Sequence, residues 1–261
     1  MTEENGKFAV CVLASGSKGN AIYMEAGDTA VLFDAGLSGV ELERRMRSRL
    51  IEPDRLNAII VSHEHSDHIR GVGVLARRYD LPVYTTEGTL RAAEKQLGRI
   101  DCLHLFECGN IFNVNGLSIH PFSISHDAED PAGFIVSANG TKVGIATDLG
   151  IATGMVKTHL KTCSMLIIEA NHDIEMLENG PYPWPLKQRI KSRSGHLSNE
   201  SARDLVAEIL HDDLKHLVLA HLSETNNTPK KALAVISKAV NGHGASITAA
   251  TQGECGQVFR L

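Results

Sequence analysis

Short apolar runs bounded by turn-forming residues recur along the chain and predict buried strands. They lie at residues 8–13, 21–25, 30–34, 58–62, 83–85, 117–124, 134–138, 142–147, 164–170 and 216–220, with two more short strands expected at the C-terminus. A glycine-rich turn at residues 15–20 separates the first two runs, as in a meander. Asn139-Gly140 predicts a hairpin, because this dipeptide suits a two-residue type I′ turn.

Apolar residues at helical spacing lie between several of these runs and predict helices. The first helix has Ser38 as its N-cap and Glu41 at the capping-box position. The others are expected at residues 69–79, 87–97, 154–160, 199–211 and 229–240. Residues 181–185 form a Pro-broken segment that leads into a basic stretch. No internal repeat or linker divides the β-rich first half from the α/β second half, so a single domain over residues 1–261 is expected.

The composition is that of an ordinary globular protein, with 43% hydrophobic and 22% charged residues. The net charge of −5 gives no overall basic field, so a polyanion such as nucleic acid must be bound by a local patch. No apolar run approaches the ~18 residues that span a bilayer, and no secretory signal opens the chain, so no membrane partner is expected. The five cysteines form no C-x-x-C pair, which is typical of free thiols and predicts a cytoplasmic protein.

The strongest chemical signal is the hexapeptide His63-Glu64-His65-Ser66-Asp67-His68, directly after an apolar run. A template H-x-H-x-D-H is expected by chance only about 0.0016 times in a chain with this content of His and Asp. A loop between a strand and a helix lets the first two histidines face one metal ion while the Asp-His pair faces a neighbouring one. Neutral imidazoles with a carboxylate suit Zn²⁺, Fe²⁺ or Mn²⁺. The hexapeptide therefore predicts a metal site, with a solvated His-rich loop as the alternative.

The hexapeptide resembles the signature of the metallo-β-lactamase superfamily, and the resemblance extends over nearly the whole chain. It implies an α+β fold, the αβ/βα four-layer sandwich in which two β-sheets are flanked by helices. It also implies two divalent metal ions per chain, Zn²⁺ or Mn²⁺, with Fe²⁺ also acceptable to such ligands. The ligands that the resemblance assigns are, for the first ion, His63, His65 and His126 and, for the second, Asp67, His68, the bridging Asp148 and His221.

Such a site holds two metal ions about 3.5–4 Å apart through a shared carboxylate. The ions lower the pKa of a bridging water, so that hydroxide is available near neutral pH. Because this architecture hydrolyses β-lactams, thioesters, lactones and phosphodiesters, the ligands predict a hydrolase without identifying the bond. His120 competes with His126 for a ligand role, but it lies within a predicted strand, so a structural role is expected.

Two further motifs favour a phosphodiester substrate. Residues 15–20, S-G-S-K-G-N, resemble the glycine-rich turn of phosphodiesterase branches such as tRNase Z, with a simple hairpin turn as the alternative. In that branch a Glu after a strand and a His in a Gly-His-Ser-like motif help to protonate the leaving oxygen, and the matching residues here are Glu169 and His196. A carboxylate behind an imidazole raises the imidazole pKa, as a general acid requires. Together with Asp67, these two are the predicted catalytic residues.

The combined motifs resemble the YycJ/WalJ group of the superfamily. This resemblance implies a nuclease with 5′→3′ exonuclease action, with DNA favoured over RNA as the partner. Residues 187–193 carry four basic side chains and lead to His196, so phosphate contacts are expected there, with a solvated face as the alternative. The residues expected to contact substrate are Ser17, Asn20, Asn171, His172, Lys187, Arg189 and Ser198.

Two other functions compete with the nuclease interpretation. One is a small-molecule thioesterase or lactonase of the glyoxalase II type, which would need neither Glu169 with His196 nor a basic run. The other is a non-catalytic metal-binding interaction protein. The presence of every expected ligand argues against the second, because degenerate members of such families lose at least one.

Overall fold

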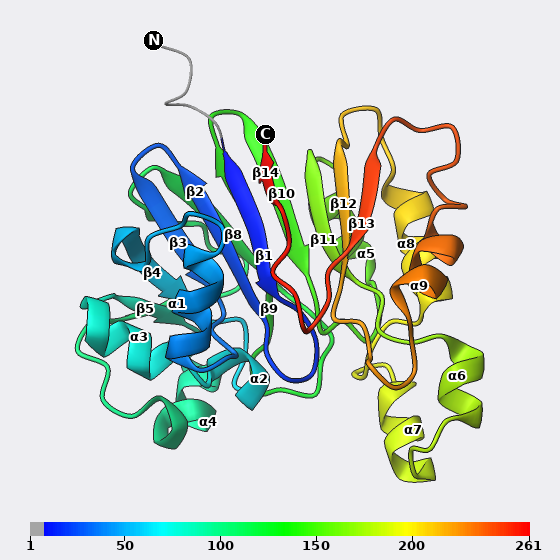
Figure 1. Cartoon of the computed structure of the whole chain (residues 1–261), viewed down its shortest axis with the longest axis horizontal. Helices are drawn as coiled ribbons and strands as arrows, with labels where there is room; N and C mark the ends of the chain where they lie inside the picture. Colours follow the sequence, from blue (N-terminus) through cyan, green and yellow to red (C-terminus); the bar gives the residue numbers. More distant parts are fainter. Residues whose placement is uncertain (1–7) are drawn as a thin grey trace.

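Two seven-stranded sheets lie face to face, with helices on both outer faces (Figure 1). The computed structural model describes residues 8–261. The first sheet has the order β14 (Val258–Arg260), β1 (Ala9–Ala14), β2 (Ala21–Ala26), β3 (Thr29–Phe33), β4 (Leu56–Ile60), β5 (Val83–Thr85) and β6 (Leu103–Leu105). The second has the order β13 (Ser246–Ala249), β12 (His216–Ala220), β11 (Met165–Glu169), β10 (Thr141–Ala146), β9 (Ala132–Ala138), β8 (Leu117–Ser123) and β7 (Phe112–Val114).

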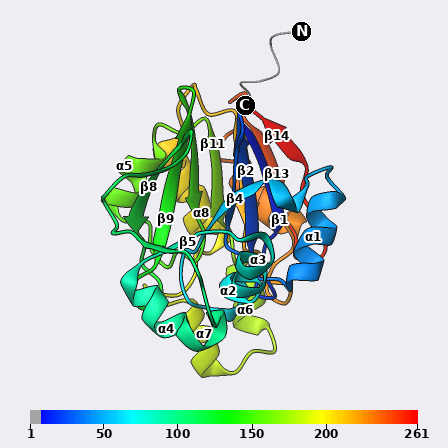
Figure 2. The same ribbon diagram turned by 90° about the vertical axis from the view of Figure 1, so that its left-hand side faces the viewer.

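Helices complete the four layers. The first sheet is covered by α1 (Gly39–Arg47), α3 (Val72–Tyr79) and α4 (Glu87–Leu97), and the second by α5 (Gly154–Leu160), α8 (Asn199–Ile209) and α9 (Pro229–Ile236). Figure 2 shows the sheets between α5 on one side and α1 on the other. The predicted sandwich is thereby confirmed. Within residues 8–261, no helix combines the length and apolar character needed to cross a bilayer.

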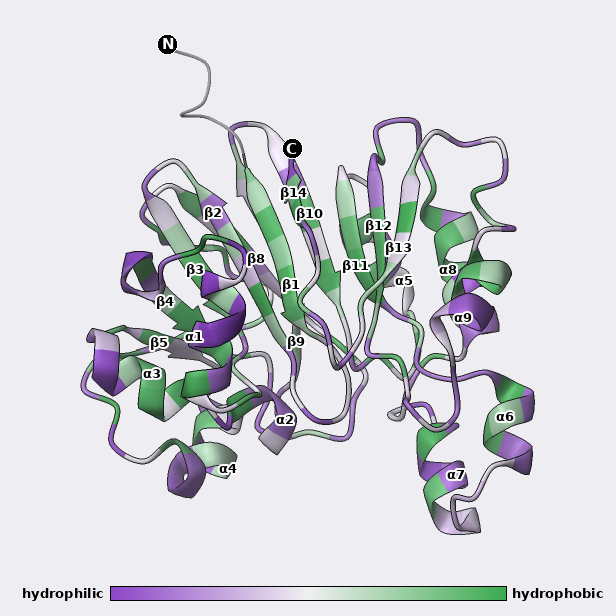
Figure 3. Cartoon of the chain, in the orientation of Figure 1, coloured by the Kyte–Doolittle hydropathy of each residue, from purple (hydrophilic) through white to green (hydrophobic). Residues whose placement is uncertain are grey.

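The central strands are buried on both faces, which explains their continuous apolar runs. In β4, Ile60 packs into the core between the sheets, whereas Ile59 packs beneath the helices of the first sheet. Figure 3 shows this apolar character as green along the strands. Because the inner core takes side chains from both sheets, we propose that residues 1–261 form one domain, as the sequence predicts; residues 1–7 lie outside the described part.

The parallel strands of both sheets end at the same edge of the sandwich. Strands β3 to β6 run parallel in one sheet, and β10 to β13 run parallel in the other. Three short helices lie along this lower edge in Figure 1, namely α2 (Ser66–Ile69), α6 (Ile174–Asn179) and α7 (Trp184–Ile190). A short 3₁₀ helix, η1 (Pro53–Arg55), leads into β4 at the opposite end of that strand. The loops at the lower edge therefore bring together residues that are distant in the sequence.

One helix prediction was wrong, and helix α7 was not predicted. The single helix expected at residues 69–79 is divided into α2 and α3, because the Gly71 N–H donates to Ala35 O at 2.7 Å and a Cβ at Gly71 would lie 2.4 Å from Leu37 O. Helix α7 begins at Trp184 inside the Pro-broken segment, while residues 181–183 stay non-helical; Pro185 is tolerated because proline is compatible with the first turn of a helix. The hairpin at Asn139-Gly140 is present, with positive φ at both residues as a type I′ turn requires.

Candidate metal centre

Every predicted metal ligand lies at the lower edge of the sandwich, where a strand ends. His63 and His65 follow β4, and Asp67 and His68 lie in α2, which comes next along the chain. The ligands contributed by the second sheet follow β8, β10 and β12 and are, in that order, His126, Asp148 and His221. Asp148 and His221 both have a φ of 55°, so the chain turns sharply at these two strand ends. Residues predicted from separate parts of the sequence are thus brought into one site by the fold.

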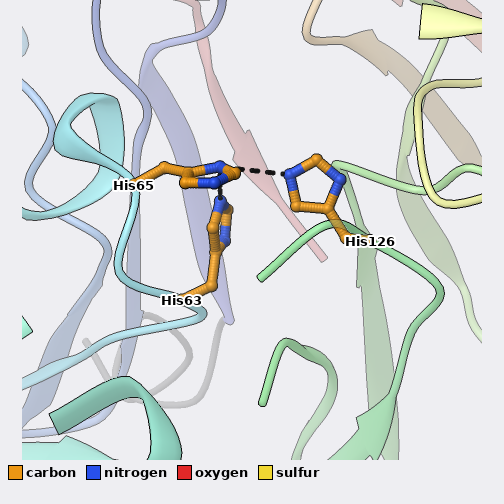
Figure 4. A group of neighbouring side chains, drawn as sticks. All are labelled: His63, His65 and His126. Carbon is orange, nitrogen blue, oxygen red and sulfur yellow. Dashed lines mark hydrogen bonds between the residues drawn. The ribbon is translucent and has the colours of Figure 1, made fainter. Parts of the chain in front are cut away.

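Three imidazoles converge in the first half of the site (Figure 4). The Nδ1 atom of His65 lies 3.1 Å from His63 Nε2 and 3.2 Å from His126 Nε2. One proton on His65 Nδ1 can form a hydrogen bond to only one of the two neighbouring nitrogens. A cation bound between them could accept a lone pair from all three nitrogens. Burial, together with the neighbouring His68, holds the pKa of His63 well below its ordinary value, which favours the neutral ligand form.

The second half of the site is rich in carboxylate. His68 Nε2 lies 3.3 Å from Asp148 Oδ2 and 3.6 Å from Asp67 Oδ2, and His221 Nε2 lies 3.7 Å from the same Asp67 oxygen. The other carboxylate oxygen of Asp148 is 3.8 Å from His126 Nε2. Asp148 therefore lies between the two halves, where a bridging ligand is required.

Buried atoms without partners support metal binding at this position. Asp148 Oδ2 and His221 Nε2 are buried, and neither has a hydrogen-bond partner within residues 8–261. Burial lowers the pKa of His68, but Asp148 and Asp34 outweigh this effect and raise the pKa well above its ordinary value. The surroundings thus favour positive charge, and imidazole with carboxylate is a donor set that divalent transition metals accept. The residues fit a metal site.

Asp34, at the end of β3, orients two of the ligands. It accepts hydrogen bonds from His68 Nδ1 at 2.7 Å and from Ser62 Oγ at 2.8 Å, and that hydroxyl lies 2.9 Å from His63 Nδ1. With their Nδ1 protons engaged, both rings present Nε2 to the site. Sequence reasoning missed Asp34, although its place at the end of an apolar run is the same signal that identified Asp148.

Glu169 orients a ligand and the predicted general acid together. Its Oε1 accepts hydrogen bonds at 2.8 Å from both His221 Nδ1 and His196 Nδ1, and its Oε2 accepts 2.9 Å bonds from the backbone N–H groups of Leu149 and Leu197. Burial would raise the pKa of Glu169, but His196 and His221 outweigh it and hold the pKa at about 2. All of its acceptor positions are occupied, so Glu169 acts through the two histidines.

His196 lies in the wall of a cavity of about 340 Å³ above these ligands. Burial lowers the pKa of His196, but Glu169 outweighs it and raises the pKa above its ordinary value. Because Nδ1 is bound to Glu169, the Nε2 atom is the one available to the cavity. The ring therefore has both the protonation and the orientation that a proton donor needs.

The residues predicted to contact substrate divide into two groups. The cavity wall includes Ser17, Asn171 and Arg189, and Arg189 forms an ion pair with Asp127. Further residues of the cavity wall that were not predicted from the sequence include Asp127, Tyr182 and Leu186. The other four predicted residues do not line the cavity. Asn20 contacts Asp67 and His68, and Lys187 donates to the carbonyl groups of Glu178 and Gly180. Ser198 caps the first turn of α8, and the buried His172 forms a β-bridge with Ser198.

Comparison with known families agrees with this geometry. Residues 29–222 match the model described as the Beta-lactamase superfamily domain. The chain belongs to the beta-lactamase superfamily. Within this superfamily the chain is 40% identical over 235 residues to exodeoxyribonuclease YycJ of Bacillus anthracis, with 89% of each chain covered. It is also 40% identical over 229 residues to exodeoxyribonuclease WalJ of Streptococcus pneumoniae, with 86% of this chain and 85% of that one covered.

The fold of this superfamily member also matches solved structures. The metallo-beta-lactamase fold protein YhfI from Bacillus subtilis superposes with a TM-score of 0.74 at 16% identity, over 98% of this chain and 100% of that one. At that identity the match concerns the fold alone. The predicted superfamily and the predicted relation to the YycJ/WalJ group are both confirmed.

Proposed function

We propose that this chain is a metal-dependent exodeoxyribonuclease that degrades DNA in the 5′→3′ direction at a site holding two divalent ions, Zn²⁺ or Mn²⁺. The observation that carries the proposal is the position of Asp148, whose carboxylate lies 3.3 Å from His68 in one half of the ligand cluster and 3.8 Å from His126 in the other. The 40% identity with YycJ and WalJ, over most of each chain, supports DNA as the substrate.

The side chains divide the chemistry among them. His63, His65 and His126 would hold one ion, while Asp67, His68 and His221 would hold the other, with Asp148 shared. When bound, the two ions would supply a water of lowered pKa and neutralise the charge that develops on the phosphate. His196 holds a proton at Nε2 for the departing oxygen, and Glu169 keeps the ring oriented and charged.

Only one basic residue of the 187–193 segment lines the cavity. Arg189 reaches it, whereas Lys187 donates to two backbone carbonyls and Lys191 pairs with Glu178. Since the net charge is −5, affinity for a polyanion depends on such local contacts and on the bound ions. We therefore assign Arg189 to a substrate phosphate, and Lys187 and Lys191 to positioning of α7.

The proposal is tested with 5′-labelled and 3′-labelled DNA and RNA oligonucleotides, with Mn²⁺ or Zn²⁺ supplied. The wild type is expected to release the 5′ label first, as mononucleotide, from DNA. Asp148→Asn should abolish this release. His216→Ala, at the opposite end of β12 from His221, is the matched control and should retain it. Hydrolysis of a thioester or lactone with no release from DNA would overturn the proposal.

A further inference from the structure

Two cysteines that are not among the predicted metal ligands lie side by side. Cys11 is buried in β1, and Cys255 is partly exposed in the loop between β13 and β14. Their sulfur atoms are 3.8 Å apart, although the residues are 244 positions apart in the sequence. Cys11 Sγ also lies 3.4 Å from the carbonyl oxygen of Gly256. The fold therefore holds two thiols from opposite ends of the chain within van der Waals contact.

The surroundings of the two sulfurs are unequal. Cys255 lies in the wall of a surface cavity of about 320 Å³, together with Arg44, Arg45, Ser48 and Arg49. Arg49 also donates a hydrogen bond to the Cys255 carbonyl. The contact with Cys11 outweighs burial and, with Arg49, lowers the pKa of Cys255 to about 6. The same contact with Cys255, together with burial, raises the pKa of Cys11 far above its ordinary value. The surroundings thus favour the thiolate form of the partly exposed Cys255 and the protonated form of the buried Cys11.

We propose that Cys255 and Cys11 form a redox-active dithiol that is oxidised to a disulfide by a small peroxide such as hydrogen peroxide. The Cys255 thiolate attacks one peroxide oxygen, the O–O bond breaks, and the released hydroxide takes up a proton to become water. Cys11 then attacks the sulfur of the resulting sulfenic acid, its proton leaves with the hydroxyl group as a second water, and the S–S bond forms. Two thiols and one peroxide give one disulfide and two waters.

The loop that carries Cys255 also contacts the turn beside the metal centre. Gln252 accepts a hydrogen bond from the Lys18 N–H at 2.6 Å and donates one to Gly19 O at 3.0 Å. In the same turn, Ser15 Oγ accepts a 2.6 Å bond from the backbone N–H of His221. Disulfide formation would therefore fasten to β1 the loop that supports this turn. Neither thiol contacts a metal ligand, so the dithiol proposal does not depend on the proposed nuclease activity.

The test uses the whole reduced protein loaded with Zn²⁺, which takes no part in redox chemistry. After treatment with hydrogen peroxide, we expect the intact mass to fall by that of two hydrogens and peptide mapping to link Cys11 to Cys255. Cys255→Ser should abolish the linkage, whereas Cys102→Ser, which removes an exposed thiol elsewhere, should leave it unchanged. Absence of a Cys11–Cys255 peptide from the oxidised wild type would overturn the proposal.

A second measurement separates a reactive thiolate from simple exposure. Iodoacetamide at pH 6 should alkylate Cys255 of the native protein about tenfold faster than it alkylates Cys102, because the surroundings of Cys255 favour its thiolate and this outweighs the lower nucleophilicity. Faster labelling of the more exposed Cys102 would contradict the proposal. Cys11→Ser, tested for folding by its retained Zn²⁺, should leave Cys255 as a sulfenic acid that dimedone traps after peroxide treatment.

Discussion

At the scale of single residues, two buried carboxylates control the site without occupying ligand positions of their own. Asp34 fixes His68 directly and His63 through Ser62, while Glu169 fixes His221 and His196. In each case the bond to Nδ1 turns Nε2 toward the ligand cluster or the cavity. The geometry of these rings therefore follows from interactions one step away from the chemistry.

Asp34→Asn tests this arrangement, because it keeps the shape of the side chain and removes its charge. We expect metal affinity to fall by about 10–100-fold, as is typical when a carboxylate partner of a ligating histidine is removed. Competition with a chelator of known affinity measures the change. Asp54→Asn, an exposed carboxylate in η1, is the control, and equal affinities for the two variants would contradict the orienting role of Asp34.

His196→Ala tests the role of His196 as proton donor when its effect is compared on two substrates, one whose leaving group needs a proton and one whose leaving group does not. DNA cleavage releases an alkoxide and should slow by about 10²–10³-fold, in line with the loss of a general acid. Hydrolysis of bis-p-nitrophenyl phosphate should fall far less, because p-nitrophenolate departs without a proton. Equal losses on both substrates, at unchanged metal content, would assign His196 to binding instead of proton transfer.

The metal ligands could be predicted from the sequence, but some of the residues around them could not. All seven predicted ligands lie together, because each is a His or Asp that follows an apolar run and the runs are strands that end at one edge. Asp34 was missed because its partners, Ser62 and His68, are fixed only by the pairing of β3 with β4. The sequence could not show that Lys187 lies outside the cavity wall, because a basic run on a helix does not reveal which of its side chains faces the cavity.

At the scale of elements, the strands were predictable because burial on both faces gives each central strand a continuous apolar run. Strands β6 and β7 were missed because β6 is exposed at all three positions and β7 is buried at only one, whereas the equally short β5 is buried at two and was predicted. The division between α2 and α3 was also missed, since nothing local distinguishes Gly71 from a tolerated helix glycine. It follows from the close approach of Ala35 and Leu37, which only the tertiary fold creates.

Gly36→Ala tests the close packing of the loop after β3 against α2. A Cβ at Gly36 would lie 1.5 Å from the Asp67 carbonyl oxygen, so the backbone that carries a metal ligand would have to move. We expect a loss of about 3 kcal/mol in the free energy of unfolding, measured by denaturant titration. Gly154→Ala, where an added Cβ meets nothing within 4 Å, should be close to neutral. Similar losses at the two positions would refute the steric explanation.

At the scale of the whole molecule, the metal centre lies across the seam between the two sheets. Four of its ligands follow β4 of the first sheet, and the other three follow strands of the second. Bound metal would therefore join the two halves of the sandwich, in addition to the inner hydrophobic core. Because metal binds the folded state, it should also stabilise that state by mass action.

Removal of metal should lower the melting temperature. With free metal at about a thousand times its dissociation constant, binding contributes about 4 kcal/mol, which corresponds to a shift of about 10 °C for a chain of this size. Thermal scans with and without EDTA measure this shift. Asp148→Asn, which removes the shared ligand, should respond much less, and an equal response would place the stabilising metal elsewhere.

The central claim is that two metal ions, joined by Asp148, form one catalytic site for DNA. Titration of the metal-stripped protein with Mn²⁺ tests it most directly, with bound metal and release of the 5′ label followed in the same samples. We predict no cleavage without metal, little at one equivalent, and full activity at two equivalents per chain. Full activity at a single equivalent, or cleavage by the stripped protein, would contradict the account.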